Sequence, residues 1–181
     1  MPMVSVNTKT MPMAHTENVS TLISDSGIVR YHLEAKIWNM YSNEGDPYWH
    51  FPEKIHVEQF DSLHNVVGSI VADTAYHYEK KSLWRAIGNV VAKNVEGTTF
   101  ETSELFWNEK APPNAGDAFY TFEKVKITNP DGSFMVGNNG FRANQALKAI
   151  FLFTAKGEVN VNESADSIPQ NPVRSDSVQH P

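Results

Sequence analysis

The part of this chain that most constrains its fold is the run of residues 83–107, LWRAIGNVVAKNVEGTTFETSELFW. It holds two stretches rich in β-branched and aromatic residues, separated by Glu96 and Gly97, a pair that favours a tight turn. A similar stretch, residues 66–78, comes just before it. A single hairpin cannot bury its apolar face alone, so we expect several such units to associate into one rolled sheet.

Apolar and polar residues alternate with a period of two in several segments. In residues 28–38 one face carries Val29, Tyr31, Leu33, Ala35 and Ile37, and the other carries Arg30, His32, Glu34 and Lys36. Residues 54–60 repeat the pattern, with Ile55 and Val57 on the apolar face. This period predicts half-buried strands. Residues 144–153 fit either a helix or a strand, and the strands expected on both sides favour an edge hairpin.

Many short strands without long helices between them favour a sandwich, a barrel or a jelly roll. We expect an all-β fold, an open twisted antiparallel β-jelly roll whose two sheets bury their apolar faces against each other. Residues 19–161 are expected to form this domain. Residues 1–18 and 162–181 lack a hydrophobic period, so we expect a flexible N-terminal segment and a disordered C-terminal tail.

The composition narrows the class of function. The 181 residues include 15 Lys and Arg against 21 Asp and Glu, a net charge of -6, with no basic cluster beyond Lys80 and Lys81. This balance argues against a nucleic-acid partner or a polybasic membrane contact. Cysteine is absent, which excludes disulfides and thiol chemistry. No apolar run approaches the ~20 residues that span a bilayer, and the N-terminus lacks a signal-peptide pattern.

No sequence motif indicates catalysis or metal binding. His32, His56 and His77 lie in predicted strands and two or three of them could converge, but metal-ligand spacings such as His-Glu-x-x-His are absent. The Glu-x-Asp pair Glu44 and Asp46 lies in a Gly/Pro turn, where a rigid carboxylate pair is hard to build. The Gly-x-Ser-x-Gly elbow is also absent. We therefore expect no enzyme activity, metal site or cofactor.

The aromatic residues allow two interpretations. The set is large for one domain and comprises Trp38, Tyr48, Trp49, Phe51, Trp84, Phe106 and Trp107. Aromatic side chains commonly fill the core of a β-sandwich, and we favour that role for each of them. The alternative is a groove wall or rim that contacts a ligand. A carbohydrate-binding or carbohydrate-active β-sandwich, the alternative function, would present such rings as an exposed platform.

Short motifs follow one another in a specific order across most of the chain. They include YWHFP at 48–52, VEQFD at 57–61, ADTAY at 72–76, GNV at 88–90 and TSELFW at 102–107. Their order over residues 19–161 resembles the OstA-like superfamily, and within it the LptC-like lipopolysaccharide-transport proteins of the Bacteroidetes type. The resemblance implies a periplasmic protein that holds lipopolysaccharide acyl chains between two sheets. It also implies two partners, an inner-membrane ABC transporter complex and a related LptA-like periplasmic bridge protein.

The resemblance and the alternation together suggest a lipid-binding groove and two docking edges. The expected groove residues are Val29, Tyr31, Leu33, Ile55, Val57, Ile70, Ala72, Ile87, Val90, Leu105 and Phe119. By analogy with the family, an edge in residues 19–33 faces the transporter. A second edge in residues 147–161, including Leu147, Ile150, Leu152 and Val159, docks the bridge protein. LptC-like proteins are tied to the inner membrane by an N-terminal segment, so we expect that anchor outside this chain.

Overall fold

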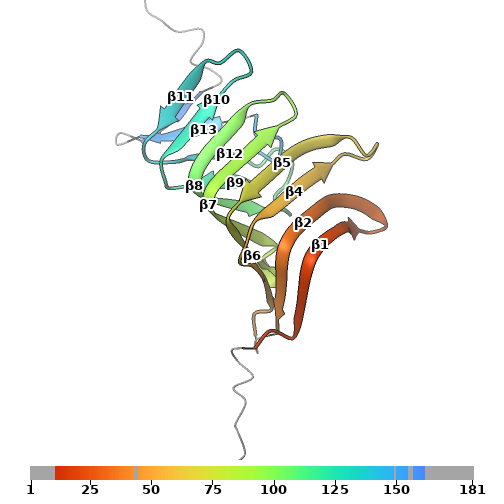
Figure 1. The fold of residues 1–181 in the computed structure, drawn as a ribbon. Helices are drawn as coiled ribbons and strands as arrows, with labels where there is room; N and C mark the ends of the chain where they lie inside the picture. The colour runs from red at the N-terminus through yellow and green to blue at the C-terminus, as the bar shows by residue number, and fades with distance from the viewer. Residues whose placement is uncertain (1–10, 43–44, 149, 155–156, 162–181) are drawn as a thin grey trace, which may run out of the picture.

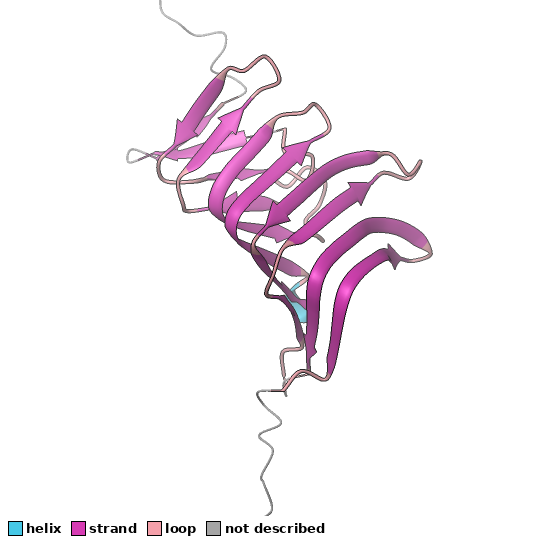
Figure 2. Ribbon diagram, viewed as in Figure 1, coloured by secondary structure: helices cyan, strands magenta, loops and turns pink. Residues whose placement is uncertain are grey.

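The computed structural model describes residues 11–42, 45–148, 150–154 and 157–161, and these form an all-β fold, as expected (Figures 1 and 2). One short 3-10 turn, Glu79–Lys81, accompanies the strands. Within these residues no helix is long and apolar enough to cross a bilayer. The strands are β1 Ala14–Asp25, β2 Ile28–Tyr41, β3 Tyr48–Phe51, β4 Ile55–Phe60, β5 Val66–Ala72, β6 Thr74–Tyr78, β7 Leu83–Asn94, β8 Thr99–Asn108, β9 Phe119–Thr121, β10 Val125–Thr128, β11 Phe134–Gly137, β12 Phe141–Ala143, β13 Ile150–Thr154 and β14 Gly157–Asn160.

The strands pair antiparallel and fold over into two layers, a twisted, jelly-roll-like arrangement (Figure 1). Long strands contribute to both layers, because β2 pairs with β4 near one end and with β3 near the other. In the same way β7 pairs with both β5 and β6. The first layer has the order β1-β2-β4-β5-β7-β8-β10-β11, and the second has β1-β2-β3-β6-β7-β8-β9-β12-β13-β14.

A line of polar contacts marks the bend between the layers. The backbone N–H of Lys54 donates to the Asp73 carbonyl at 2.8 Å, and the Asp73 N–H donates to the Gly88 carbonyl at 2.9 Å. The Asp73 carboxylate accepts from Lys54 Nζ at 2.5 Å and from Asn89 Nδ2 at 2.6 Å. Gly88 has φ +79, and a Cβ there would stand 2.9 Å from Asp73 Oδ2. The bend therefore needs glycine at this position.

The core lies between the two layers. Its largest fully buried apolar side chains are Phe51, Phe100, Phe141, Leu33, Leu105, Ile127, Val90 and Val125. Burial of one such side chain contributes roughly 1.5–3 kcal/mol, so this set supplies much of the driving force for folding. Trp84 and Trp107 are also buried, at 5% and 3% exposure. Both belong to the core, as expected.

Three features differ from or refine the expectations from sequence. β1 begins at Ala14, before the expected domain start at residue 19. Its side chains are mostly exposed and alternate little, so the start of this strand has no hydrophobic period that would predict it. In β2, Trp38 rather than Ile37 packs against the core, between the stretch that pairs with β4 and the stretch that pairs with β3. The ambiguous segment 144–153 contains β13, which forms a hairpin with β14, so the strand interpretation is confirmed. The remaining predicted tail residues, 1–10 and 162–181, lie outside the described residues.

Candidate functional site

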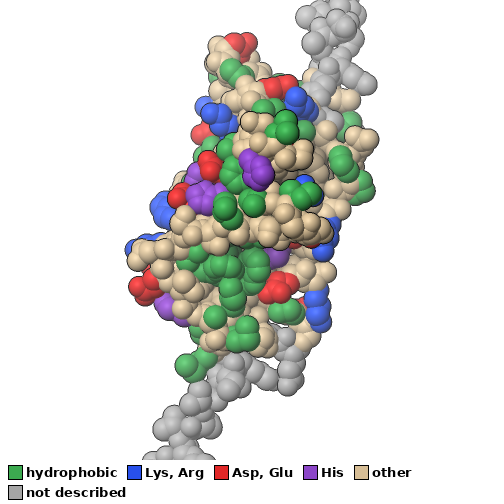
Figure 3. All heavy atoms as spheres, turned by 90° about the vertical axis from the view of Figure 1, so that its right-hand side faces the viewer, with side chains coloured by type: hydrophobic (Ala, Val, Ile, Leu, Met, Phe, Trp, Pro, Cys, Tyr) green, Lys and Arg blue, Asp and Glu red, His purple; other side chains and the backbone are tan. Residues whose placement is uncertain are grey.

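An open cavity of about 780 Å³ lies between the layers, next to the turn that joins β1 and β2. Side chains from both layers and from the loop after β8 line it. They are Ile23, Ser24, Asp25, Arg30, Tyr31, Trp49, Gln59, Phe60, His77, Trp84, Glu109, Lys110, Ala111, Pro113 and Gln145. Figure 3 views the molecule from the side of this turn, and hydrophobic side chains gather near the middle of that face. An apolar ligand approaching this side would meet hydrophobic surface.

A buried polar cluster forms one wall of the cavity. The Glu109 carboxylate accepts a hydrogen bond from Trp84 Nε1 at 3.1 Å and lies 3.2 Å from His77 Nε2. The His77 ring is sandwiched close to two indoles, with centroids 4.6 Å from Trp49 and 4.5 Å from Trp84. Burial acts to raise the pKa of Glu109, but the hydrogen bonds and charge of His77 outweigh it and lower that pKa. The carboxylate therefore stays ionised inside a largely aromatic wall.

Tyr31 contributes an aromatic ring to the opposite side of the cavity. Its ring meets Trp107 edge to face, with centroids 5.1 Å apart. Burial, followed by the nearby charge of Glu109, raises the pKa of Tyr31 to about 12. The hydroxyl therefore remains protonated at physiological pH.

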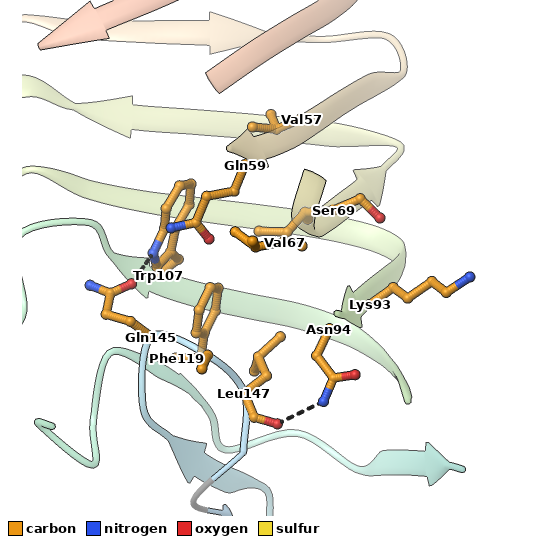
Figure 4. Close-up of a pocket in the computed structure, with 13 residues that line it drawn as sticks. Val57, Gln59, Val67, Ser69, Lys93, Asn94, Trp107, Phe119, Gln145 and Leu147 are labelled. Atoms are coloured by element: carbon orange, nitrogen blue, oxygen red, sulfur yellow. Dashed lines mark hydrogen bonds between the residues drawn. The ribbon is translucent and has the colours of Figure 1, made fainter. Parts of the chain in front are cut away.

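Further along the interior the space narrows to a slit of about 20 Å³, which is room for about one water molecule (Figure 4). Apolar side chains from both layers line the slit, including Val57, Ile70, Phe119 and Leu147. Gln59 and Gln145 line both the cavity and the slit, so these two side chains stand at the junction between them.

Gln145 is held firmly at this junction. Its Oε1 accepts from Trp107 Nε1 at 3.0 Å, and its Nε2 donates to the carbonyls of Asn108 at 2.8 Å and Ala111 at 3.1 Å. The side-chain amide therefore connects residues after β12 to the end of β8 and the loop beyond it. Figure 4 shows the Gln145–Trp107 contact at the edge of the slit.

Most of the predicted groove residues lie in the interior. Seven of them are buried there, namely Leu33, Ile55, Val57, Ala72, Val90, Leu105 and Phe119. Tyr31 lines the open cavity, Ile70 lines the slit, and Val29 is half-buried. Most of the set therefore forms a packed core, and the open space begins at Tyr31.

Ile87 is an exception, because it lies on the outer face of β7. Trp84 and Ala86 are the buried residues of this part of the strand, and Ile87 is directly opposite Glu104 on β8. The buried residues beyond the bend, Val90, Ala92 and Asn94, are also an odd number of positions from Ile87, so alternation itself places Ile87 outside, and the expectation that both Ile87 and Val90 lie inside was wrong.

Several cavity residues were not singled out from the sequence. From the sequence, His77 is a candidate only as a metal ligand, and neither Glu109 nor Gln145 belongs to a recognisable motif. His77 interrupts a strand whose neighbouring inward residue is the buried Ala75, and a polar residue at such a position was the available signal. Glu109 and Gln145 follow strands β8 and β12 in loops, where periodicity gives no information.

The predicted docking residues fall in different environments. Leu147 and Ile150 are buried at 4% and 7% exposure, and Leu152 packs against the core, whereas Val159 is 47% exposed. β13 is paired on both sides, by β12 and β14, so β14 forms the described edge of the second layer. At the other end β1 is the edge strand, while residues 28–33 belong to β2, between β1 and β4.

The structure also places the predicted histidines. His32 and His56 lie on the outer face of β2 and β4, each with a ring nitrogen 3.4 Å from a carboxylate, Glu58 and Glu34 respectively. His77 lies in the interior, so the three do not converge. Among the residues that the structure describes, no group of three His, Asp or Glu side chains is placed to hold a metal ion.

A row of aromatic side chains crosses the outer face of the second layer. Tyr41 stacks on Tyr48 at 4.7 Å and 11°, and Phe106 stacks on Tyr120 at 5.0 Å and 9°. Other members are His50, Tyr76, Tyr78, Phe122 and Phe153. Stacking at these angles turns ring faces toward neighbouring rings, which leaves less open ring face than a flat sugar-stacking platform requires.

No protein-family model matches the chain, and a search of curated proteins found no match.

Proposed function

We propose that this chain is a lipid-transfer module that holds the acyl chains of lipopolysaccharide between its two layers. The observation that carries the proposal is the open interior cavity of about 780 Å³, continuous in its lining with an apolar core. Each methylene removed from water contributes about 0.8 kcal/mol, so ten methylenes contribute on the order of 8 kcal/mol. Such binding needs no dedicated headgroup clamp, which suits a chain with a net charge of -6.

Two of the edge strands, β1 and β14, support a role in transfer between partners. β1 and β14 each pair with a single described strand, so each has backbone donors and acceptors available for another strand. In this proposal the module works in the periplasm, anchored at the inner membrane. There β1 faces an inner-membrane ABC transporter complex, and β14 docks an LptA-like bridge protein.

The polar groups of the cavity favour holding a ligand over transforming it. Glu109 directs its carboxylate at His77 and Trp84, and Gln145 uses its amide to join two segments of backbone and Trp107. Both side chains already form hydrogen bonds within the protein, and these bonds hold the wall in place. The proposal therefore contains no catalytic step.

A carbohydrate-binding function is the second candidate, because an aromatic row does cross the outer face of the second layer. Its rings stack on one another, as in the Phe106–Tyr120 and Tyr41–Tyr48 pairs, so fewer ring faces are open to a sugar. Phe122, at 69% exposure, is the most accessible of these rings. The interior cavity provides the stronger argument for an acyl ligand.

Photo-crosslinking from the cavity wall tests the proposal. We would replace Tyr31, which lines the cavity, or Tyr76, which lies on the outer aromatic row, with p-benzoylphenylalanine and irradiate each protein with lipopolysaccharide. A crosslink from Tyr31 and not from Tyr76, with lipid identified by mass spectrometry, is the expected result. Equal crosslinking at both sites, or no lipid retained by folded protein, would overturn it. Competition by the deacylated saccharide as strong as by whole lipopolysaccharide would favour the carbohydrate alternative.

A further inference from the structure

We infer that residues 144–148 form a strap that closes the inner slit and lifts to let an acyl chain pass beyond the open cavity. The strap follows β12 and precedes β13, and it crosses the interior between the two layers (Figure 4). The inference rests on the proposed function of the interior as a lipid path and adds to it a movable closure.

The strap is tied to both layers. Toward the second layer, Gln145 bonds Trp107 and the backbone after it, as described above. Toward the first layer, Asn94 Nδ2 donates to the Leu147 carbonyl at 3.2 Å, and Lys148 Nζ lies 2.7 Å from Glu96 Oε1. Both first-layer partners belong to the turn region between β7 and β8. The strap therefore bridges the two layers at the closed end of the interior.

The Leu147 side chain fills the slit beneath the strap. Its side chain is 4% exposed and lines the slit together with Val57, Ile70 and Phe119. Its backbone has φ 53, a left-handed conformation that branched side chains rarely adopt. Burial of the side chain and the tight turn, in which the Leu147 N–H donates to the Asn144 carbonyl at 2.9 Å, hold it there.

The contacts that hold the strap can break by local unfolding. The strap takes part in no strand ladder, so it can move without breaking the pairing of β12 or β13. The Lys148–Glu96 pair is exposed, with 45% and 59% of the two side chains accessible, and is therefore weak. Ala146 is exposed as well.

Lifting the strap would join the two spaces of the interior. Gln145 lines both the cavity and the slit, and Leu147 fills the slit, so their displacement would extend the cavity toward Phe119. The lining beyond the junction is mainly apolar, whereas the open cavity includes Asp25 and Arg30. An acyl tail can enter the extension, and a charged headgroup remains at the open end.

Cysteine labelling tests the strap, because the chain has no cysteine of its own. In Leu147→Cys we expect slow reaction with a maleimide in the free protein and a rate at least about tenfold higher with purified lipopolysaccharide bound. Ala146→Cys, at an exposed residue of the strap, should react fast in both states. Ala143→Cys, in β12 and 0% exposed, should react slowly in both.

Two outcomes separate the strap from the proposed function. If lipopolysaccharide crosslinks from the Tyr31 position while Leu147→Cys stays as slow as Ala143→Cys, the strap does not lift and the inference is overturned. If lipopolysaccharide does not bind at all, the proposed function fails, and the strap is judged in the free protein.

The free-protein measurement uses Gln145→Ala, which removes three hydrogen bonds of the strap. We expect it to accelerate labelling of Leu147→Cys several-fold and to leave Ala143→Cys unchanged. Equal acceleration at both positions would mean that residues 144–148 open only with the whole domain, which overturns the inference. Circular dichroism on each variant verifies that the fold is retained.

Discussion

The two ends of the interior are built from the same kind of strand, yet one is open and the other is packed. Near the β1–β2 turn, Tyr31 and Trp49 line a cavity of about 780 Å³. Near β9 and β12, the slit holds about 20 Å³, and Phe100 and Phe141 stack in the core at 5.3 Å. The difference comes from what crosses between the layers. Leu147 fills the space at the packed end, whereas the Glu109 cluster lies along the wall of the open end.

The largest expected effect contrasts an aromatic residue from each end. Phe100→Ala should lower the free energy of unfolding by about 3–5 kcal/mol, because it leaves an enclosed void in the packed end. Trp49→Ala should cost about 2 kcal/mol, since one side of that ring already faces open space and no closed void forms. Urea denaturation of both variants measures the difference. Equal losses of unfolding free energy would contradict the difference between the two ends, because they would mean that the cavity is packed in solution.

The next effect concerns the polar wall of the open end. Glu109→Gln should cost about 1–2 kcal/mol near pH 7, because the charged hydrogen bonds to His77 and Trp84 become neutral ones. The pKa of Glu109 is lowered in the folded state, so its contribution is present above the ordinary value near 4.5 and is lost as pH falls through the folded value. Unfolding free energies of wild type and variant, measured from pH 7 to pH 3, should converge at the acid end. A gap that stays constant over this range would contradict the assignment.

An effect of similar size is expected at the bend, which both ends of the interior share. Gly88→Ala should cost about 1–2 kcal/mol, because φ is +79 and the new Cβ would meet Asp73 at 2.9 Å. Gly132→Ala is the matched control, since φ is +86 but nothing lies within 4 Å of its Cβ. Thermal unfolding should show the larger loss for Gly88→Ala. The same loss in both variants would mean that the close approach of Asp73 adds nothing to backbone strain.

The smallest effect is expected at the strap. Lys148→Ala removes an exposed ion pair with Glu96 and should change the free energy of unfolding by less than about 0.5 kcal/mol. A cost of 2 kcal/mol or more in urea denaturation would show that the strap is an integral part of the packed end. The packed end would then be a continuous core and not a groove that a movable strap closes.

Sequence reasoning predicted the strands better than their bends. Alternation correctly placed Leu33, Ile55 and Val57 between the layers, because a strand turns successive side chains to opposite faces. It was wrong at Ile37, because Trp38 packs against the core instead where β2 passes from β4 to β3. Ile87 was expected inside although it lies an odd number of positions from the buried Trp84 and Val90. An extra residue at a bulge reverses every later inward position, and no local composition announces it reliably.

The sequence by itself determined that this chain is all-β, where most of its strands run and which faces they bury, because these follow from local sterics and from hydrophobic period. Only the tertiary structure decided which buried residues surround open space. That depends on Glu109 meeting His77, and on Gln145 meeting Trp107, pairs separated by 32 and 38 positions in the chain. Such contacts join segments that are far apart in the chain, and periodicity within one strand contains no information about them.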